Sequence, residues 1–269
     1  MRIVFSRKGF DGSAGGCPSP IVDGRPVSLP IPTSGRSDTR FAELGLGGLV
    51  EALTRGRTRG VALCHADPDL VRGAFGQTGV AQSHLERSGV REGDLFLFFG
   101  LFRRLDPGSR RPRFDPCEKP HHRLFGWLAI GRIARLGADG SRARAEFPKL
   151  ARHPHLGPGW DANNTLYLAS PLFRPHPAGR SFPGFGVARR ASAGLRLTAP
   201  GAPPSLWSVP NWLSPLAGGV GMSYHGASGR WLPGRCRVVS RGQEFVADIG
   251  ERADARAWLA AILAEMVDG

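Results

Sequence analysis

The chain has 269 residues, a net charge of +14 and a hydrophobic content of 41%, which is enough for a sizeable core. No segment approaches the roughly 20 consecutive apolar residues that span a membrane, and the N-terminus lacks the apolar run of a secretory signal peptide. These features favour a cytoplasmic protein and argue against a membrane partner.

Arginine supplies most of the positive charge, because lysine occurs only as Lys8, Lys119 and Lys149. A basic balance of this size attracts phosphates and acidic partners. The abundance of Ala, Gly, Pro and Arg is also typical of a GC-rich bacterial genome, so coding bias is the alternative explanation. The four cysteines form no C-x-x-C pair, which predicts free thiols.

Short strands separated by proline and glycine dominate the pattern. We expect strands over residues 2–6, 60–64, 95–104, 124–136, 165–173, 195–198 and 235–249. We expect helices over 40–54, 78–88 and 252–267, the second ended by Gly89. This order shows little strict alternation of strand and helix, so it predicts an α+β fold in a single domain over residues 1–269.

The expected architecture is a strand-rich mixed sheet or β-barrel with flanking helices. Gly93 and Asp94 precede the strand 95–104, and a polar loop leads to GWLAIGRI at 126–133. This pattern is similar to part of the barrel of PUA-like and ASCH-like domains, which bind RNA or modified bases.

Eight segments in order resemble the nucleotide modification associated domain 3 family. They are SRKGFDGSAGG with PSPI (6–21), CHADPDL (64–70), GAFGQTGVAQSHL (73–85), GVREGDLFLFFGLFR (89–103), HRLFGWLAIG (122–131), NNTLYLA (163–169), SYHG (223–226) and GQEFV (242–246). The resemblance spans almost the whole chain. It implies an association with enzymes that modify nucleotides or bases, DNA bases among them, but it assigns no catalytic residue.

A basic, glycine-rich turn follows the first expected strand. Backbone N–H groups in such a turn can form an anion-binding nest. We expect Arg7 and Lys8 to bind a phosphate or carboxylate, with Asp11 orienting one of them; a solvated turn is the alternative. Lys8 precedes the glycines, so the turn is not a Walker A loop.

His65 and Asp67 end an expected strand, where period-two alternation places them on one face. With a distant histidine they would form the two-His-one-carboxylate set that binds Fe(II). The candidates for that histidine are His225, His155 and His84, and we take His225 as the expected ligand.

The same segment also suits acid–base catalysis, in which Asp67 or Asp69 orients His65. We therefore take His65, Asp67 and Asp69 as the expected catalytic residues. The alternative is a purely structural loop in which Asp67 caps a turn before Pro68.

Other polar and aromatic residues are candidates for substrate binding, zinc binding or base stacking. Four amides are expected to bind substrate, with ordinary surface polarity as the alternative: Gln77, Gln82, Asn163 and Asn164. A zinc site is a further hypothesis, although no second ligand pair has zinc spacing: Cys117, His121 and His122. A late aromatic group either stacks a base or packs in the core: Trp207, Trp212, Tyr224 and Trp231. Gln243 and Glu244 lie in the last expected strand, and a buried Glu244 would need an arginine or metal partner.

Three functions remain open at this point. The first is an enzyme of nucleotide or base modification that acts on a phosphate-bearing substrate. The second is an oxidoreductase, a non-haem Fe(II) oxygenase acting on a peptide or small metabolite. The third is a non-catalytic reader of modified nucleic acid, which would use the arginine-rich run at 103–113 and the PUA-like part.

Overall fold

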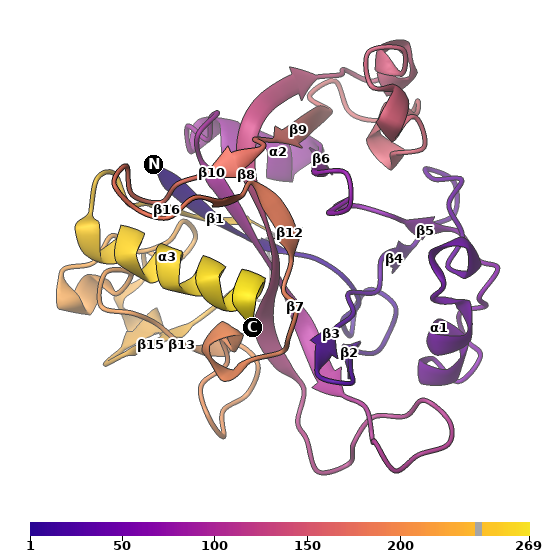
Figure 1. The fold of residues 1–269 in the computed structure, drawn as a ribbon, viewed down its shortest axis with the longest axis horizontal. Coiled ribbons are helices and arrows are strands. Elements are labelled where there is room, and N and C mark those ends of the chain that lie inside the picture. The colour runs from indigo at the N-terminus through magenta and orange to yellow at the C-terminus, as the bar shows by residue number, and fades with distance from the viewer. Residues whose placement is uncertain (240–243) are drawn as a thin grey trace.

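The computed structural model describes residues 1–239 and 244–269 (Figure 1). Its strands are β1 (Arg2–Arg7), β2 (Ser19–Val22), β3 (Arg25–Pro26), β4 (Ile31–Pro32), β5 (Cys64–His65), β6 (Ala74–Gln77), β7 (Leu95–Arg104), β8 (His121–Arg135), β9 (Thr165–Ala169), β10 (Leu172–Phe173), β11 (Phe182–Pro183), β12 (Phe185–Val187), β13 (Leu206–Ser208), β14 (Trp231–Leu232), β15 (Arg235–Arg237) and β16 (Glu244–Asp248). Its α-helices are α1 (Gly47–Leu53), α2 (Gly79–Arg87) and α3 (Ala253–Asp268).

A nine-stranded sheet organises the chain. Its main path runs β16-β1-β7-β8-β9-β6, with β2, β3 and β12 attached beside it. β1 and β2 both pair in parallel with β7, whereas the remaining pairings in this sheet are antiparallel. The sheet is mixed and does not close, so the α+β prediction is confirmed and the barrel alternative does not hold.

Side chains of the central strands alternate between two cores, as the pleat requires. On one face Phe5 of β1 and Leu97 of β7 pack in the core that includes α3, which crosses the strands in Figure 1. On the other face Val4 and Phe96 pack with Leu85 of α2. Because both faces are covered, the strands are apolar throughout, and the run from 95 to 104 is recognisable from sequence.

The N-terminal strand leaves the sheet where the basic turn begins. β1 pairs with β7 as far as Arg7, and β2 continues along the same edge from Ser19. The intervening segment therefore projects at the middle of β7, held there by a hydrogen bond from the Lys8 N–H to the Phe99 carbonyl (2.8 Å). This placement directs the turn toward the segment that contains β4 and β5.

Several expected elements differ from those observed. The helix expected over 40–54 is divided, because Gly45 adopts a left-handed conformation (φ 72°) between a short 3-10 turn and α1. The strand expected over 60–64 shrinks to β5. In the segment 195–198, Leu195 ends a 3-10 turn, and Arg196 and Thr198 form isolated bridges. The strand expected over 235–249 divides into β15 and β16, and residues 240–243 lie outside the described residues. Within the described ranges, no helix combines the length and apolar character needed to cross a membrane.

Candidate metal centre

Three side chains from two separate parts of the chain meet beside β6. They are His65 at the end of β5, Asp67 two residues later, and His155 from a 3-10 turn (Pro154–Leu156) between β8 and β9. Their potential ligand atoms all lie within 4.8 Å of one another. Asp67 Oδ2 is 3.7 Å from His65 Nε2 and 4.0 Å from His155 Nε2. In the part of the chain that the structure describes, no other group of three His, Cys, Asp or Glu side chains is arranged to hold an ion.

His155 is fixed with one nitrogen directed at Asp67. Its Nδ1 donates to Asn164 Oδ1 (2.6 Å), while Asn164 Nδ2 donates to the His155 carbonyl (3.0 Å). The Trp160 indole stacks on the imidazole, with ring centroids 4.1 Å apart and an interplanar angle of 8°. Burial lowers the pKa of His155 to about 3, so the ring is neutral near pH 7. Its Nε2 therefore presents a lone pair toward Asp67.

Asp67 is held by groups on its other side. Its Oδ1 accepts a hydrogen bond from the Gly76 N–H of β6 (2.9 Å). His153 Nδ1 accepts from the His155 N–H (3.3 Å), which leaves the proton on Nε2. That Nε2 lies 3.1 Å from Asp67 Oδ1, although the alignment is too poor for a full hydrogen bond. Burial acts to raise the pKa of Asp67, but contacts with His153 and His65 outweigh it and hold that pKa well below its usual range.

These donors fit a divalent first-row transition metal. Two ligand atoms bound to one ion at about 2.1 Å lie roughly 3.0–3.4 Å apart. The separations from Asp67, 3.7 and 4.0 Å, are slightly longer than this, and all three ligand atoms lie within 4.8 Å of one another, so side-chain rotations would bring them to bonding distance of one ion. Two imidazoles with one carboxylate form the set typical of non-haem Fe(II). Asn164 and Gly76 supply the supporting hydrogen bonds that ordered metal ligands normally have.

The triad opens into a cavity of about 220 Å³. Arg7, Lys8 and Gly9 of the basic turn also line this cavity. Its lining further includes Gln77 of β6 and Trp160. The cationic residues of the turn and the His–Asp–His triad therefore line one cavity, although Lys8 and His65 are 57 residues apart in sequence.

Residues 2–248 match the family described as nucleotide modification associated domain 3. The chain belongs to this family. No curated protein and no solved structure matches the chain. The matched range contains the triad and the basic turn, so the residues of the candidate centre all lie within the family's domain.

The basic turn of this nucleotide modification associated domain 3 protein differs from the expected anion nest. Asp11 Oδ1 accepts hydrogen bonds from the N–H groups of Ser13 and Ala14 (both 2.8 Å) and from the Ser13 hydroxyl (2.7 Å). The carboxylate of the turn itself thus occupies the nest, and Asp11 stabilises the turn. Binding of an outside anion would depend on the side chains of Arg7 and Lys8.

Lys8 and Gln77 meet at a buried carboxylate on β16. Glu244, of which 1% is exposed, accepts hydrogen bonds at Oε1 from Lys8 Nζ (3.1 Å) and Gln77 Nε2 (2.6 Å). The expectation that a buried Glu244 needs a partner is met by a lysine and an amide, not by arginine or metal. Gln243 lies outside the described residues.

Two of the expected substrate-binding amides stabilise α2 instead. Asn163 accepts from the Gly79 N–H and donates to the Gly79 carbonyl (both 2.8 Å), which anchors the start of the helix. Gln82 is buried and accepts from the Tyr167 hydroxyl (2.9 Å). Asn164, expected to bind substrate, instead positions His155. Of the four amides only Gln77 lines the metal pocket.

The expected metal ligand His225 lies in a different environment. Its Nδ1 bonds to the Ser223 carbonyl (2.7 Å) and its Nε2 accepts from the Val239 N–H (3.2 Å). Both ring nitrogens are thus engaged with backbone, and no contact in the described structure joins His225 to His65 or Asp67. His155, the alternative candidate, takes the position expected for His225.

Asp69 and the proposed zinc residues also lie apart from the triad. Asp69 bonds to the N–H of Arg72 (3.0 Å) and pairs with its guanidinium (3.0 Å), so it stabilises a turn. Cys117 is exposed. His121 Nδ1 contacts the Lys119 carbonyl (3.4 Å), and His122 Nδ1 accepts a hydrogen bond from the Trp207 indole N–H (3.0 Å).

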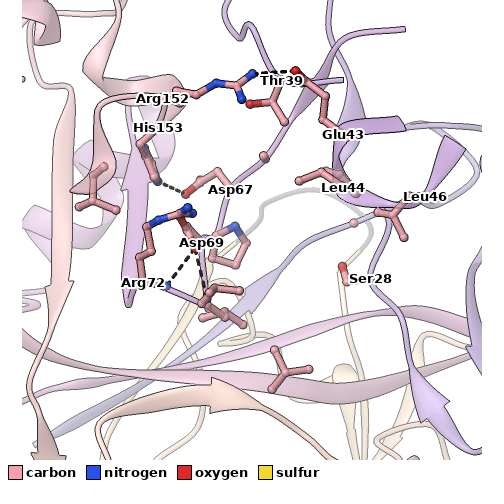
Figure 2. A pocket seen from close by; sticks show the side chains of 18 of the residues that line it. Ser28, Thr39, Glu43, Leu44, Leu46, Asp67, Asp69, Arg72, Arg152 and His153 are labelled. Carbon is pink, nitrogen blue, oxygen red and sulfur yellow. Dashed lines mark hydrogen bonds and ion pairs between the residues drawn. The ribbon is translucent and has the colours of Figure 1, made fainter. Parts of the chain in front are cut away.

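A second, larger cavity of about 720 Å³ lies on the other side of Asp67 (Figure 2). It shares Gly9 and Asp67 with the metal pocket. Figure 2 shows His153 against Asp67, and the Arg152–Glu43 ion pair (3.0 Å) at another wall. Asp67 therefore lies in the wall between two cavities.

Sequence reasoning did not anticipate the roles of Gly76 and His153. A Cβ at Gly76 would lie 2.2 Å from two atoms of the His155 ring, so glycine is required for the ring to reach Asp67. No local pattern marks such a contact, because it joins β6 to a segment almost 80 residues away. His153 and His155 lie at a 3-10 turn (Pro154–Leu156) whose direction toward Asp67 no sequence pattern indicated.

Proposed function

We propose that this protein is a metal-dependent enzyme that modifies a nucleotide or a nucleic-acid base, with His65, Asp67 and His155 as its metal ligands. The observation that supports this most strongly is the shared cavity, in which the triad faces Arg7 and Lys8. Two cations beside a metal site suit a phosphate-bearing substrate. Membership of a family associated with nucleotide modification agrees with this substrate class.

Each group has a distinct task in this proposal. Arg7 and Lys8 bind the phosphate, while Glu244, itself hydrogen-bonded by Gln77, holds the Lys8 ammonium in place. Asn164 and Trp160 hold His155 with its Nε2 toward the ion, while Gly76 orients Asp67. A divalent ion in such a site supplies a Lewis acid or an activated water.

Binding and turnover of nucleoside 5′-monophosphates test this function. Arg7→Gln should weaken binding of ribose 5-phosphate to the metal-loaded protein roughly 10- to 100-fold, the size expected for one charge-assisted contact. Arg189→Gln, at an exposed arginine outside the cavity, serves as the matched control. Mass spectrometry of the nucleotide after incubation reports turnover. Equal binding by both variants would reject the phosphate assignment.

An Fe(II)-dependent oxygenase acting on a peptide or small metabolite is the second candidate. The two-His-one-carboxylate composition favours it, because this set leaves positions open for substrate and oxygen. Consumption of dioxygen by the Fe(II)-loaded protein with a phosphate-free substrate would favour this candidate over the first. Turnover that needs phosphate and no dioxygen would exclude it.

A non-catalytic reader of modified nucleic acid is supported least. Part of the arginine-rich run at 103–113 is engaged within the protein. Arg113 pairs with Asp106 (2.6 Å), and Arg104 contacts Asp115 (3.4 Å) and Glu118 (3.2 Å). These pairs reduce the charge that the run offers to a nucleic-acid backbone.

A further inference from the structure

A third cavity, of about 430 Å³, adjoins the metal pocket and has no role in the mechanism above. It shares Gln77 and Thr78 with the metal pocket. The rest of its lining comes from α2, β16 and the residues before β15, and includes His84, Tyr224 and Glu244. A ligand bound at Arg7 and Lys8 could therefore extend past Gln77 into this second space.

The Tyr224 side chain lines this cavity and is not packed in the core. Of its surface 49% is exposed, whereas Trp207, Trp212 and Trp231 of the same aromatic group are buried. Its backbone is left-handed (φ 65°), a conformation that bulky residues rarely adopt. Strain of this kind is typical of functional positions.

His84 supports one side of the Tyr224 ring, with centroids 4.2 Å apart and an interplanar angle of 31°. Ser223 Oγ accepts from the Val246 N–H (2.8 Å) and forms a second hydrogen bond with His84 Nε2 (2.9 Å), which fixes the ring. Burial and the nearby Arg87 lower the pKa of His84. The histidine is thus a neutral, fixed platform, and the exposed tyrosine is available for stacking by another flat ring.

The buried Glu244 gives this cavity a polar edge. Its Oε1 accepts from both Lys8 and Gln77, but its Oε2 has no hydrogen-bond partner among the described residues. A buried carboxylate oxygen without a donor is costly. Because the Lys8 ammonium already balances its charge, a neutral N–H donor suits this oxygen better than a second cation.

We propose that this cavity is the nucleobase subsite of the enzyme, in which the base stacks on Tyr224 and donates an N–H to Glu244 Oε2. A nucleobase combines the flat face and the N–H edge that these two residues would recognise. The proposal rests on the proposed function, since the phosphate would occupy the adjoining pocket beside Arg7 and Lys8.

Calorimetric binding to the metal-loaded protein tests the stacking contact. The ligands are AMP, GMP, CMP and UMP, with ribose 5-phosphate as the base-free reference. Tyr224→Leu should weaken binding of the tightest nucleotide roughly 5- to 100-fold and leave ribose 5-phosphate unchanged, while Tyr224→Trp restores nucleotide binding. Leu216→Ala, at an exposed apolar residue outside the cavity, is the surface control.

A ligand without the N–H tests the role of Glu244. The 5′-monophosphate of purine riboside, or of pyrimidin-2-one riboside if a pyrimidine binds tightest, should bind the wild type roughly 10-fold more weakly than its natural counterpart. Glu244→Gln should reduce this difference between the two ligands. A merely structural role of Glu244 would weaken both ligands equally and leave the difference intact.

The same Tyr224 variants, titrated with a single-stranded oligonucleotide of eight residues, separate a free nucleotide from a base in a strand. Dependence on Tyr224 in either series supports the subsite. Unchanged binding of mononucleotide and oligonucleotide to Tyr224→Leu overturns it. If metal and ribose 5-phosphate still bind in that case, the proposed function stands; if neither binds to the wild type, the proposed function itself fails.

Discussion

His155→Ala is expected to remove stoichiometric metal binding while the fold survives. The substitution deletes a neutral imidazole whose Nε2 lies 4.0 Å from Asp67 Oδ2 and leaves only His65 and Asp67 as ligands. The measurement is metal content after anaerobic loading and desalting, with circular dichroism to verify folding. His176→Ala, which removes an exposed histidine, should retain the metal content of the wild type.

A smaller loss of metal affinity is expected from a substitution at Asn164, which contacts the metal ligand His155. Asn164→Leu removes the acceptor for the His155 Nδ1–H (2.6 Å), so the ring loses its fixed tautomer and orientation. Loss of such a supporting partner typically lowers metal affinity about 10- to 100-fold. Retention of wild-type affinity in both His155→Ala and Asn164→Leu would mean that the ion, if bound, lies elsewhere.

Gly76→Ala is expected to disturb the same centre by steric means alone. The new methyl group would lie 2.2 Å from the His155 ring, and both residues are fully packed. Overpacking of this kind costs roughly 1–3 kcal/mol of unfolding free energy, and displacement of the ring should lower metal affinity at least about 10-fold. Thermal unfolding and a metal titration report the two effects.

Gly12→Ala is the matched control for Gly76→Ala. Gly12 lies in the basic turn, and a Cβ there would meet no atom within 4 Å. It should therefore leave both stability and metal affinity near their wild-type values. If Gly76→Ala behaved like Gly12→Ala, the close packing of β6 against His155 would not be required for the site.

The local half of the triad could be predicted from the sequence, and the distant half could not. The spacing of His65 and Asp67 was recognised from strand alternation, but the structure brings them together through a tight turn after β5, in which the Asp67 N–H donates to the His65 carbonyl (2.9 Å). Choosing the second histidine required knowledge of the path of the segment between β8 and β9, which has no long regular element. His225 and His155 are both buried, and only the backbone partners of His225 show that it is not available as a ligand.

The basic turn shows how a correct local pattern can have a different chemical outcome. Glycine, serine and cations in a turn indicate an anion-binding nest, and a nest is present. Asp11 lies within the turn at a spacing that lets its own carboxylate fill the nest. The anion in the nest is therefore a side chain of the turn itself. A motif of glycine, serine and cations does not show whether its nest is filled by such a side chain or by a ligand.

The fold was predictable where apolar runs are long. β7 has the bounds expected from its sequence, and α2 and α3 begin or end within one residue of expectation. Strands of two or three residues such as β4 and β14 were missed, because their pairing depends on tertiary contacts and not on a hydrophobic period.

The metal content of the native protein tests the central claim most directly. The protein would be purified without air and without added metal, analysed by inductively coupled plasma mass spectrometry, and analysed again after loading with Fe(II), Mn(II) or Zn(II). The His65, Asp67 and His155 site predicts about one equivalent per chain that is lost in His155→Ala. Absence of metal both before and after loading would contradict the account.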